Sequence, residues 1–238
     1  MSLSDTAIEI SSLKFGWKKH HPILSINELN IQRNARTFLK GESGSGKSTL
    51  LGLIAGILTP DSGYLKVFDL EVSSLSSAKR DQFRSEHMGI IFQMFNLLPF
   101  LSIEENVSLP CRFSKVRKSN CHKNHGSVEA EAKELLNKLG LDPKLFWERK
   151  VSDLSVGQQQ RVAAARALIG SPSIIIADEP TSALDTKNRN SFIELLSQSA
   201  STSETTLLFV SHDETLASEF DFTIDIDNIN LATEGLNQ

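Results

Sequence analysis

Apolar and polar residues alternate along the first forty residues of the chain in the way that half-buried strands require. The segment IEISSLKF begins at residue 8, ILSINELNI follows at residues 23–31, and TFL occupies residues 37–39. Alternation with a period of two predicts strands, because successive side chains point to opposite faces of a sheet. We therefore expect this part of the chain to form a group of short strands.

Short apolar runs alternate with helical patterns downstream, which predicts an α/β fold with a parallel sheet covered on both faces. The predicted strands are YLKVF after a turn at residues 60–63, MGIIF at 88–92, SIIIA at 173–177 and TTLLFV at 205–210. The predicted helices are LLGLIAGIL at 50–58, NSFIELLSQSA at 190–200 and a helical block at 102–168 that includes EAEAKELLNKLG. The last residues, 228–238, have the pattern of a short strand followed by a frayed tail.

Composition and charge exclude several classes of protein. Of the 238 residues 39% are hydrophobic and 23% charged, which is typical of a globular protein. The net charge of −4 gives no reason to expect binding to nucleic acid. Two cysteines are too few for a disulfide framework. No secretory signal is visible in MSLSDTAIEI, and no apolar run approaches the ~20 residues of a membrane span, so we expect any membrane role to depend on a partner.

A glycine-rich segment, GESGSGKST, lies between the third strand and the first predicted helix. It matches the pattern G-x-x-x-x-G-K-[ST], in which backbone N–H groups wrap the phosphates of a nucleotide. Lys47 then carries positive charge to the β- and γ-phosphates, and the Ser48 hydroxyl is a ligand for Mg²⁺. The alternative is a flexible loop that contains a lysine by chance, but the strand before it and the helix after it are the context that the motif requires. This phosphate loop comprises Gly41, Glu42, Ser43, Gly44, Ser45, Gly46, Lys47, Ser48 and Thr49.

Two carboxylates end the apolar run IIIADE at residues 174–179. A buried strand would carry them to the carboxyl edge of the sheet, where open α/β sheets bind ligands. We expect Asp178 to bind Mg²⁺ and Glu179 to polarise an attacking water. Alone, the pair reads equally well as an acidic turn before Pro180, and it is the phosphate loop that favours a site.

The segment LSVGQQQRVAAARAL, residues 154–168, combines a polar start with a run of alanines. Ser155 and Gln158 fit the capping-box pattern S-x-x-[EQ], which begins a helix with exposed amides. Gly157 allows close approach of another backbone, and the helix dipole favours an anion there. The segment resembles the signature motif of ABC-transporter ATPase domains, and we call it the signature segment.

Three more residues fall in the order typical of that family. Gln93 resembles the Q-loop glutamine, Asp185 in SALD (182–185) resembles the D-loop acid, and His212 in VSHD resembles the switch histidine. The resemblance covers about residues 8–226. It implies a P-loop NTPase core with a parallel sheet, an N-terminal antiparallel β subdomain and an inserted α-helical subdomain. Residues 1–238 would then be a single ABC-type ATPase domain, with 1–93 and 172–238 as RecA-like core plus β subdomain and 94–171 as helical subdomain.

The chemistry that the resemblance implies is ATP hydrolysis with Mg²⁺. ATP would lie on the phosphate loop with Trp17 stacked on adenine, and Phe15 is the runner-up for that position. Glu179 is implied as general base, Gln93 reaches the metal and the water, and His212 contacts the γ-phosphate. The implied catalytic residues are thus Lys47, Gln93, Glu179 and His212, and the implied metal ligands are Ser48, Gln93 and Asp178. Outside the phosphate loop the implied nucleotide-binding residues are Trp17, Ser155, Gly157, Gln158 and Asp185.

The family resemblance also implies a composite site in a head-to-tail pair of protomers, for which we expect a homodimer. The signature segment of one protomer would contact the γ-phosphate bound by the other. In this chain Val156 replaces a glycine that the family usually has. Because Ser155 and Gly157 remain, we expect activity. A β-branched residue tolerates positive φ poorly, so the contact between protomers could be weakened at Val156.

The run IIFQMFNLLPFLSIEENVSLP, residues 90–110, resembles a subgroup that includes lipoprotein-releasing, macrolide-exporting and cell-division ATPases. It implies a four-helix permease with a large periplasmic domain as partner, driven by ATP-dependent dimerisation in lipoprotein release, export or mechanotransmission. The chain would be peripheral on the cytoplasmic face of the inner membrane and would contact the membrane only through the permease. An apolar cluster in this run could form the docking groove or could cap the local core: Phe95, Leu97, Leu98, Pro99 and Phe100.

Residues 111–126, CRFSKVRKSNCHKNHG, are basic and contain no acidic residue. Cys121, His122 and His125 lack a complete four-ligand spacing, so a metal site is not favoured. We interpret the segment as a solvated loop, near anionic lipid headgroups.

Other functions fit the sequence less well. A soluble ABC-type ATPase that is not coupled to transport is the main alternative, but neither a long heptad insertion nor a second such domain is visible. A GTPase would need N-K-x-D, and the Asn-Lys pair at 137–138 lies in a predicted helix. A non-hydrolysing subunit is disfavoured because Lys47, Asp178, Glu179 and His212 are intact.

Overall fold

The computed structural model describes residues 5–18, 21–182 and 184–232, without the side chain of residue 187. Ala183 of the SALD segment and residues 233–238 of the expected tail lie outside the described residues. The chain forms two compact units. The first comprises Met1–Arg84 and Leu208–Gln238, and the second is the continuous stretch Ser85–Leu207.

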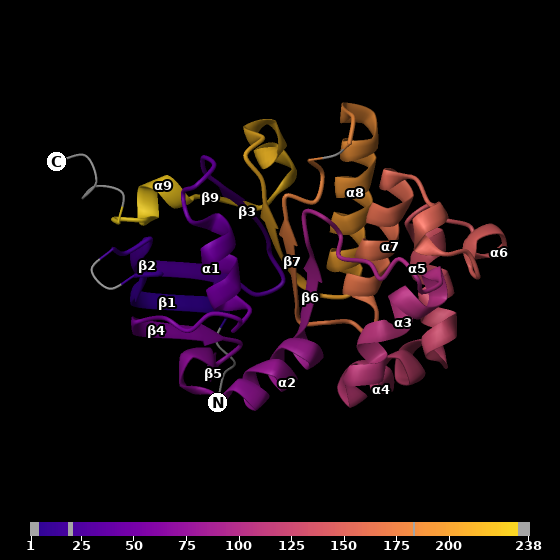
Figure 1. The fold of residues 1–238 in the computed structure, drawn as a ribbon, viewed down its shortest axis with the longest axis horizontal. Helices are drawn as coiled ribbons and strands as arrows, with labels where there is room; N and C mark the ends of the chain where they lie inside the picture. The colour runs from indigo at the N-terminus through magenta and orange to yellow at the C-terminus, as the bar shows by residue number, and fades with distance from the viewer. Residues whose placement is uncertain (1–4, 19–20, 183, 233–238) are drawn as a thin grey trace. The chain divides into compact units, whose positions relative to one another are not determined.

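An antiparallel sheet makes up one part of the first unit (Figure 1). It consists of β1 (Thr6–Phe15), β2 (Leu24–Gln32), β4 (Ser62–Val67) and β5 (Leu70–Glu71), in the order β2-β1-β4-β5. The central strand β1 pairs Ile10 with Leu29 on one side and with Leu65 on the other. All three of these side chains are buried. The alternating pattern thus correctly predicted strands β1 and β2, and the antiparallel arrangement is the one that the family resemblance implied.

The first unit also holds the strand and helix on either side of the phosphate loop. Strand β3 (Arg36–Lys40) runs parallel to β9 (Phe222–Asp225), with Leu39 opposite Ile224. Helix α1 (Lys47–Ile54) follows the loop and buries Leu50, Leu53 and Ile54. Shorter elements complete this unit, namely η1 (Val72–Ser74), η3 (Glu214–Glu219) and α9 (Ile226–Ile229).

Helix α9 corrects the expectation of a strand near the end of the chain. Residues 226–229 form a single helical turn, and Asn230 after it makes an isolated bridge to Ile26. Asp225 caps the turn by accepting a hydrogen bond from the N–H of Asp227 at 3.0 Å. This local cap competes with extended structure, which the apolar spacing alone had favoured.

The second unit combines a parallel pair of strands with a group of helices (Figure 1). Strand β6 (Met88–Ile91) is parallel to β7 (Ile174–Asp178), with Ile90 opposite Ile176. The helices of the block are α3 (Ile103–Phe113), α4 (Lys115–His125), α5 (Val128–Lys138), α6 (Pro143–Phe146), η2 (Val151–Asp153) and α7 (Val156–Leu168). Helix α8 (Thr186–Thr202) follows β7. Two elements cross the division between the units, α2 (Ser77–His87) and β8 (Thr206–Val210).

Helix α4 shows that the basic segment 111–126 is not a loop. Ser114 caps the helix by accepting a hydrogen bond from the N–H of Arg117 at 3.1 Å. Arg117 is 2% exposed, and its guanidinium donates to the carbonyls of Met88, Ala167 and Ile169. The interpretation as a loop was therefore wrong, and the Arg117 charge is satisfied by buried backbone oxygens rather than by water. Lys115, Lys118 and Lys123 are exposed, as expected for a solvated segment.

The alanines of the signature segment let α7 lie close to its neighbours. Ala163, Ala164 and Ala165 have no more than 1% of their surface exposed. A Cβ on Gly89 of β6 would come within 2.2 Å of the carbonyl oxygen of Ala167, so strand and helix touch at backbone distance. Small residues are thus needed on both elements for this packing.

In the described part of the chain, no helix combines the length and the apolar character that crossing a bilayer would take.

Candidate nucleotide site

Glycines shape the phosphate loop into a cradle at the start of α1. Gly46 caps the helix with a φ of 100°, in the left-handed region that favours glycine. A Cβ at Gly46 would lie 2.7 Å from Leu24 Cδ2, so any larger residue would also force the Leu24 side chain to shift. No acidic residue lies in the first turn of α1, which leaves its positive dipole end without a built-in counter-charge.

Lys47 and Ser45 give this loop its polar interior. The Lys47 ammonium donates to the carbonyls of Gly41 and Glu42, each at 2.7 Å, and the residue is 8% exposed. The Ser45 hydroxyl is buried and has no hydrogen-bond partner among the residues that the structure describes. Ser48, the predicted metal ligand, lies in the first turn of α1 and is exposed. An orphaned buried hydroxyl beside a lysine is the arrangement that an anionic ligand would satisfy.

Residues from the far end of the sequence brace the phosphate loop. Asn230 donates to the carbonyl of Ser45 at 3.2 Å and to that of Ile23 at 2.9 Å. Asp227 accepts a hydrogen bond from the N–H of Glu42 at 3.1 Å. Sequence reasoning missed both residues, since 185 positions separate each pair in the chain. No local motif marks them.

His212 lies beside the strand that leads into the phosphate loop. Ser211, the residue before it, donates its N–H to the carbonyl of Leu39 in β3 at 3.2 Å. Lys40, at the end of β3, pairs with Glu214 at 2.9 Å and with Asp225 at 3.3 Å. The hydrogen bond to Glu214 raises the pKa of Lys40 and the second carboxylate adds to this effect. Within the first unit, the predicted switch histidine therefore follows a segment that is hydrogen-bonded to β3, and the phosphate loop follows β3 itself.

Trp17 and Phe15 have different environments. Phe15 is buried, whereas Trp17 is 64% exposed. Their rings meet edge to face, with centroids 5.1 Å apart. Phe15 thus packs in the core, and the indole ring that it contacts is largely open to solvent. Of the two rings, this favours Trp17 for stacking on a base.

The strand-end carboxylates belong to the second unit. Asp178 is the last residue of β7 and Glu179 follows it, both half-buried. Glu179 has a φ of 46°, which is unusual for a residue with a side chain and costs roughly 1 kcal/mol or more. Gln93, two residues after the end of β6, is exposed in a turn.

The capping box predicted for the signature segment is present. The Ser155 hydroxyl accepts from the N–H of Gln158 at 3.4 Å, and Gln158 Oε1 accepts from the N–H of Ser155 at 2.9 Å. A Cβ on Gly157 would meet Leu184 at an ordinary 3.8 Å, and its φ lies outside the left-handed region. Nothing in the described chain therefore requires glycine at this position.

Val156 takes the first helical position of α7 and is 48% exposed. The φ angle of Val156 is not positive. The predicted conflict between a β-branched side chain and a positive φ does not arise, because the helix already starts at this residue.

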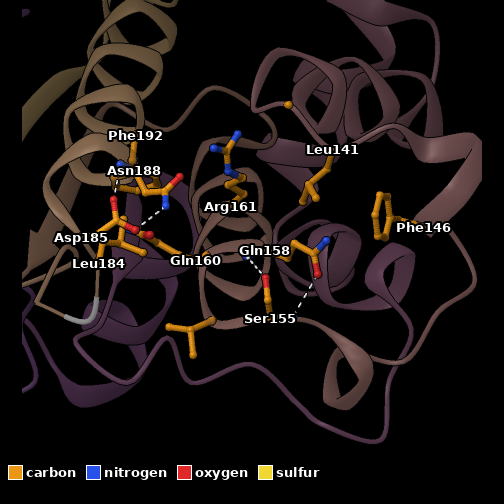
Figure 2. A pocket seen from close by; sticks show the side chains of 13 residues that line it. Leu141, Phe146, Ser155, Gln158, Gln160, Arg161, Leu184, Asp185, Asn188 and Phe192 are labelled. Carbon is orange, nitrogen blue, oxygen red and sulfur yellow. Dashed lines mark hydrogen bonds between the residues drawn. The ribbon is translucent and has the colours of Figure 1, made fainter.

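A cavity of about 480 Å³ opens next to the signature segment (Figure 2). Asp185, just before α8, and Asn188 in α8 lie on one side of it, and Leu141 and Phe146 on the other. Asp185 caps α8 by accepting from the backbone N–H of Asn188 at 3.0 Å. The cavity is lined by Gly140, Leu141, Phe146, Ser155, Val156, Gly157, Gln158, Gln160, Arg161, Leu184, Asp185, Asn188 and Phe192. The structure thus brings together the four nucleotide-binding residues that the sequence predicted in this unit.

Arg161 and Arg166 anchor the signature helix. Arg161 donates to the carbonyl of Leu139, and Arg166 donates to the carbonyls of Phe95 and Asn96 at 2.6 and 2.7 Å. Burial lowers the pKa of Arg166. The signature helix is thus attached to the segment that begins at Gln93.

Burial decides between the two alternatives for Phe95. Phe95 is 7% exposed and belongs to the core, so it cannot form part of a docking surface. Met94 and Phe100 are the exposed apolar residues of this segment, at 81% and 70%. Leu97 and Leu98 are half-buried and Pro99 is exposed. Phe95 and Asn96 both have positive φ, at 58° and 49°, so the backbone turns sharply where the buried ring lies.

The structure shows no group of three or more His, Cys, Asp or Glu residues arranged to hold a metal, as far as the described residues extend.

Known proteins resemble this chain over most of its length. Residues 24–182 match the protein family described as "ABC transporter". The lipoprotein-releasing system ATP-binding protein LolD of Hydrogenovibrio crunogenus is 35% identical over 222 residues, which cover 92% of this chain and 93% of that protein. The macrolide export ATP-binding/permease protein MacB of Mannheimia succiniciproducens is 40% identical over 204 residues, or 86% of this chain and 30% of that protein.

A solved structure has the same fold. It is the dimeric, post-hydrolysis state of the ATP-binding cassette MJ0796 bound to ADP and Pi, with a TM-score of 0.77 and 31% identity. The match covers 92% of this chain and 93% of that chain. Family, relatives and fold agree on an ATP-binding subunit with ATPase activity. The chain belongs to the ABC transporter family.

Proposed function

We propose that this ATPase acts as a pair of identical protomers, in which the signature helix of one completes the nucleotide site of the other. The observation that carries the proposal is the free N-terminal face of α7. Its amides are organised by the Ser155 capping box, Gly157 leaves space in front of them, and the first turn has no acidic residue. By contrast, α3 begins with Glu104 and Glu105. An electropositive helix end with no acidic residue in its first turn suits a phosphate from outside the protomer.

Within one protomer, the phosphate loop binds the triphosphate and Trp17 stacks on the base. The glycines bring backbone N–H groups to the phosphates, and Lys47 exchanges its two carbonyl acceptors for phosphate oxygens. His212 holds the γ-phosphate, and Gln93 reports the occupied site to the rest of the complex. Asp185 contributes from the edge of the signature cavity.

Glu179 is the general base in this proposal. It accepts the proton of the attacking water as the bond to the γ-phosphorus forms and the bond to the β–γ bridging oxygen breaks, which gives ADP and phosphate. The positive φ of Glu179 supports this role, since strained backbone is often found where a side chain must be aimed.

Oxygen donors make up the proposed Mg²⁺ set of Ser48, Gln93 and Asp178. A hydroxyl, an amide oxygen and a carboxylate are the ligand types that Mg²⁺ prefers, with water and phosphate oxygens completing its shell. The ion would neutralise charge that develops on the phosphates.

We further propose an integral membrane permease as partner, which would hold the chain peripherally on the cytoplasmic face of the inner membrane. Met94 and Phe100 support this, as two large apolar side chains exposed in one short segment. The segment is joined to the signature helix through Arg166, so a partner bound there would sense the nucleotide site. The names of LolD and MacB favour lipoprotein release or export over a soluble ATPase that is uncoupled from transport.

Glu179→Gln tests the general-base role. We expect ATP binding to persist, turnover to fall at least about 100-fold, and an ATP-bound dimer to accumulate in size-exclusion chromatography. Glu204→Gln is a matched control, because Glu204 also has a positive φ but lies in the turn after α8. Near-native turnover of Glu179→Gln would refute the proposal.

A further inference from the structure

Cys111 and Cys121 form a buried pair of thiols in the second unit. Cys111 lies on α3 and Cys121 on α4, and their sulfur atoms are 3.5 Å apart. Cys111 is 6% exposed and Cys121 is fully buried. The chain has only these two cysteines, so one intramolecular disulfide can form and no other.

The surroundings make the two thiols unequal. The hydrogen bond from Cys121 lowers the pKa of Cys111, and the positive charge of Arg117 acts in the same direction. The shared proton, burial and the neighbouring Glu131 raise the pKa of Cys121. Glu131 is itself buried, with Oε1 accepting from the N–H of Gly170 at 2.7 Å. Cys111 is therefore the sulfur that more readily carries negative charge, and Cys121 holds the proton.

We propose that Cys111 and Cys121 are a peroxide oxidation site that closes reversibly to a disulfide between α3 and α4. The Cys111 thiolate attacks one oxygen of hydrogen peroxide and the O–O bond breaks, which gives a sulfenic acid and, after protonation of the leaving hydroxide, water. The Cys121 sulfur then attacks the Cys111 sulfur and the S–O bond breaks. The departing hydroxide takes the Cys121 proton as a second water. Two thiols are oxidised, one peroxide is reduced, and a dithiol reductant reverses the change.

A disulfide between Cys111 and Cys121 would affect the signature helix because of where the two residues lie. Arg117 lies one helical turn before Cys121, on the same buried face of α4. Its guanidinium donates to the carbonyls of Ala167 and Ile169 at the C-terminal end of the signature helix. A disulfide would thus fix the helix that supports α7. An S–S bond of ~2.0 Å needs the sulfurs to approach by only about 1.5 Å, which rotation of the two side chains can supply.

Intact mass spectrometry of the full purified chain tests this site. After brief treatment with a small excess of hydrogen peroxide, we expect a monomer that has lost two hydrogen atoms and both titratable thiols, restored by dithiothreitol. The melting temperature should rise by ~5 °C on oxidation, as expected for a cross-link that closes a short loop. Unreacted thiols, a gain of oxygen atoms, disulfide-linked dimers or a lower melting temperature would each overturn the proposal.

Single variants test the order of the two steps. In Cys121→Ser, Cys111 should stop at a sulfenic acid that a cyclic dione probe traps. In Cys111→Ser, Cys121 should give no trapped product on the same timescale. Alanine variants at the same positions and circular dichroism control for folding. Equal trapping in both serine variants would overturn the assignment of Cys111 as the attacking thiol.

Discussion

Gln160 of the signature helix donates a hydrogen bond of 2.7 Å to the carbonyl of Pro180, the residue after Glu179. Gln160 is 1% exposed, so this contact is shielded from water. It connects two sequence motifs, the signature segment and the strand-end carboxylates, inside a single unit. The glutamines that begin the signature segment therefore differ in role, because Gln158 caps the helix and Gln160 holds the backbone beyond Glu179.

Replacing Gln160 with Leu should destabilise the chain by about 1–3 kcal/mol, because the carbonyl of Pro180 is left without its donor. Turnover should fall as well, since the backbone that follows Glu179 loses its support. Urea denaturation and steady-state ATP hydrolysis measure the two effects. Gln159→Leu is the matched control, as Gln159 donates to the carbonyl of Leu154 instead. Equal losses in the two variants would contradict a specific role for Gln160.

Trp17→Ala should weaken ATP binding about tenfold, as expected when an aromatic side chain no longer stacks on a base. The chain has two tryptophans, so Trp147→Phe leaves Trp17 as the single indole and its fluorescence should be quenched by ATP. Titration with ATP gives the dissociation constant of Trp17→Ala and the fluorescence quenching of Trp147→Phe. If Trp17→Ala binds ATP with native affinity, the base is held elsewhere.

Phe100→Glu should abolish co-purification of the chain with its permease and leave ATP hydrolysis by the isolated chain unchanged. The proposed docking segment depends on exposed apolar area, which a charge removes. Phe113→Glu is matched in residue type and exposure, at 76% against 70%, but lies at the end of α3. Affinity purification from membranes measures how much permease each of the two variants retains. Retention of the permease by Phe100→Glu would show that the partner does not bind there.

The ion pair between Arg36 and Asp221 should make stability fall in acid. Hydrogen bonds from the Arg36 side chain lower the pKa of Asp221 below its usual 3.8. A folded-state pKa below that of the unfolded chain gives stability that is complete above the unfolded value and is lost as pH falls through the folded one. Asp221→Asn should thus melt below the native chain at neutral pH, and the difference should shrink below about pH 4.

Melting curves across this pH range measure the effect, and Arg36→Met serves as the reciprocal variant. It should reproduce the pH dependence of Asp221→Asn, because either substitution removes the same pair. A difference between native and variant chains that stays constant down to pH ~3 would argue against the shift.

Short-range features of the site could be predicted from the sequence. The phosphate loop, the Ser155 capping box and the buried runs that become β1, β6 and β7 depend on residues a few positions apart. The fold class and the family followed from their order, and the comparisons confirmed both.

Long-range partners could not be predicted in the same way. The basic pattern of residues 111–126 does not reveal that Arg117 is buried, because its acceptors, such as the carbonyl of Ile169, lie 52 positions away and are backbone atoms. The sequence left Phe95 open between a docking groove and the local core, because an apolar pattern in a loop does not show which side chains turn inward; the structure buries it. Val156 was judged by a rule for positive φ that does not apply at the start of a helix.

Asn230 sets a lower limit on the length of chain that can bind nucleotide. Residues 24–182 suffice to recognise the family, yet a fragment cut at those boundaries would lack β1, β9 and the amide that holds the Ser45 carbonyl. Its phosphate loop would keep every residue of the motif but lose the hydrogen bonds to Asp227 and Asn230 that hold the loop in place. Truncations, fusions and circular permutations of this protein should therefore preserve the chain through residue 230.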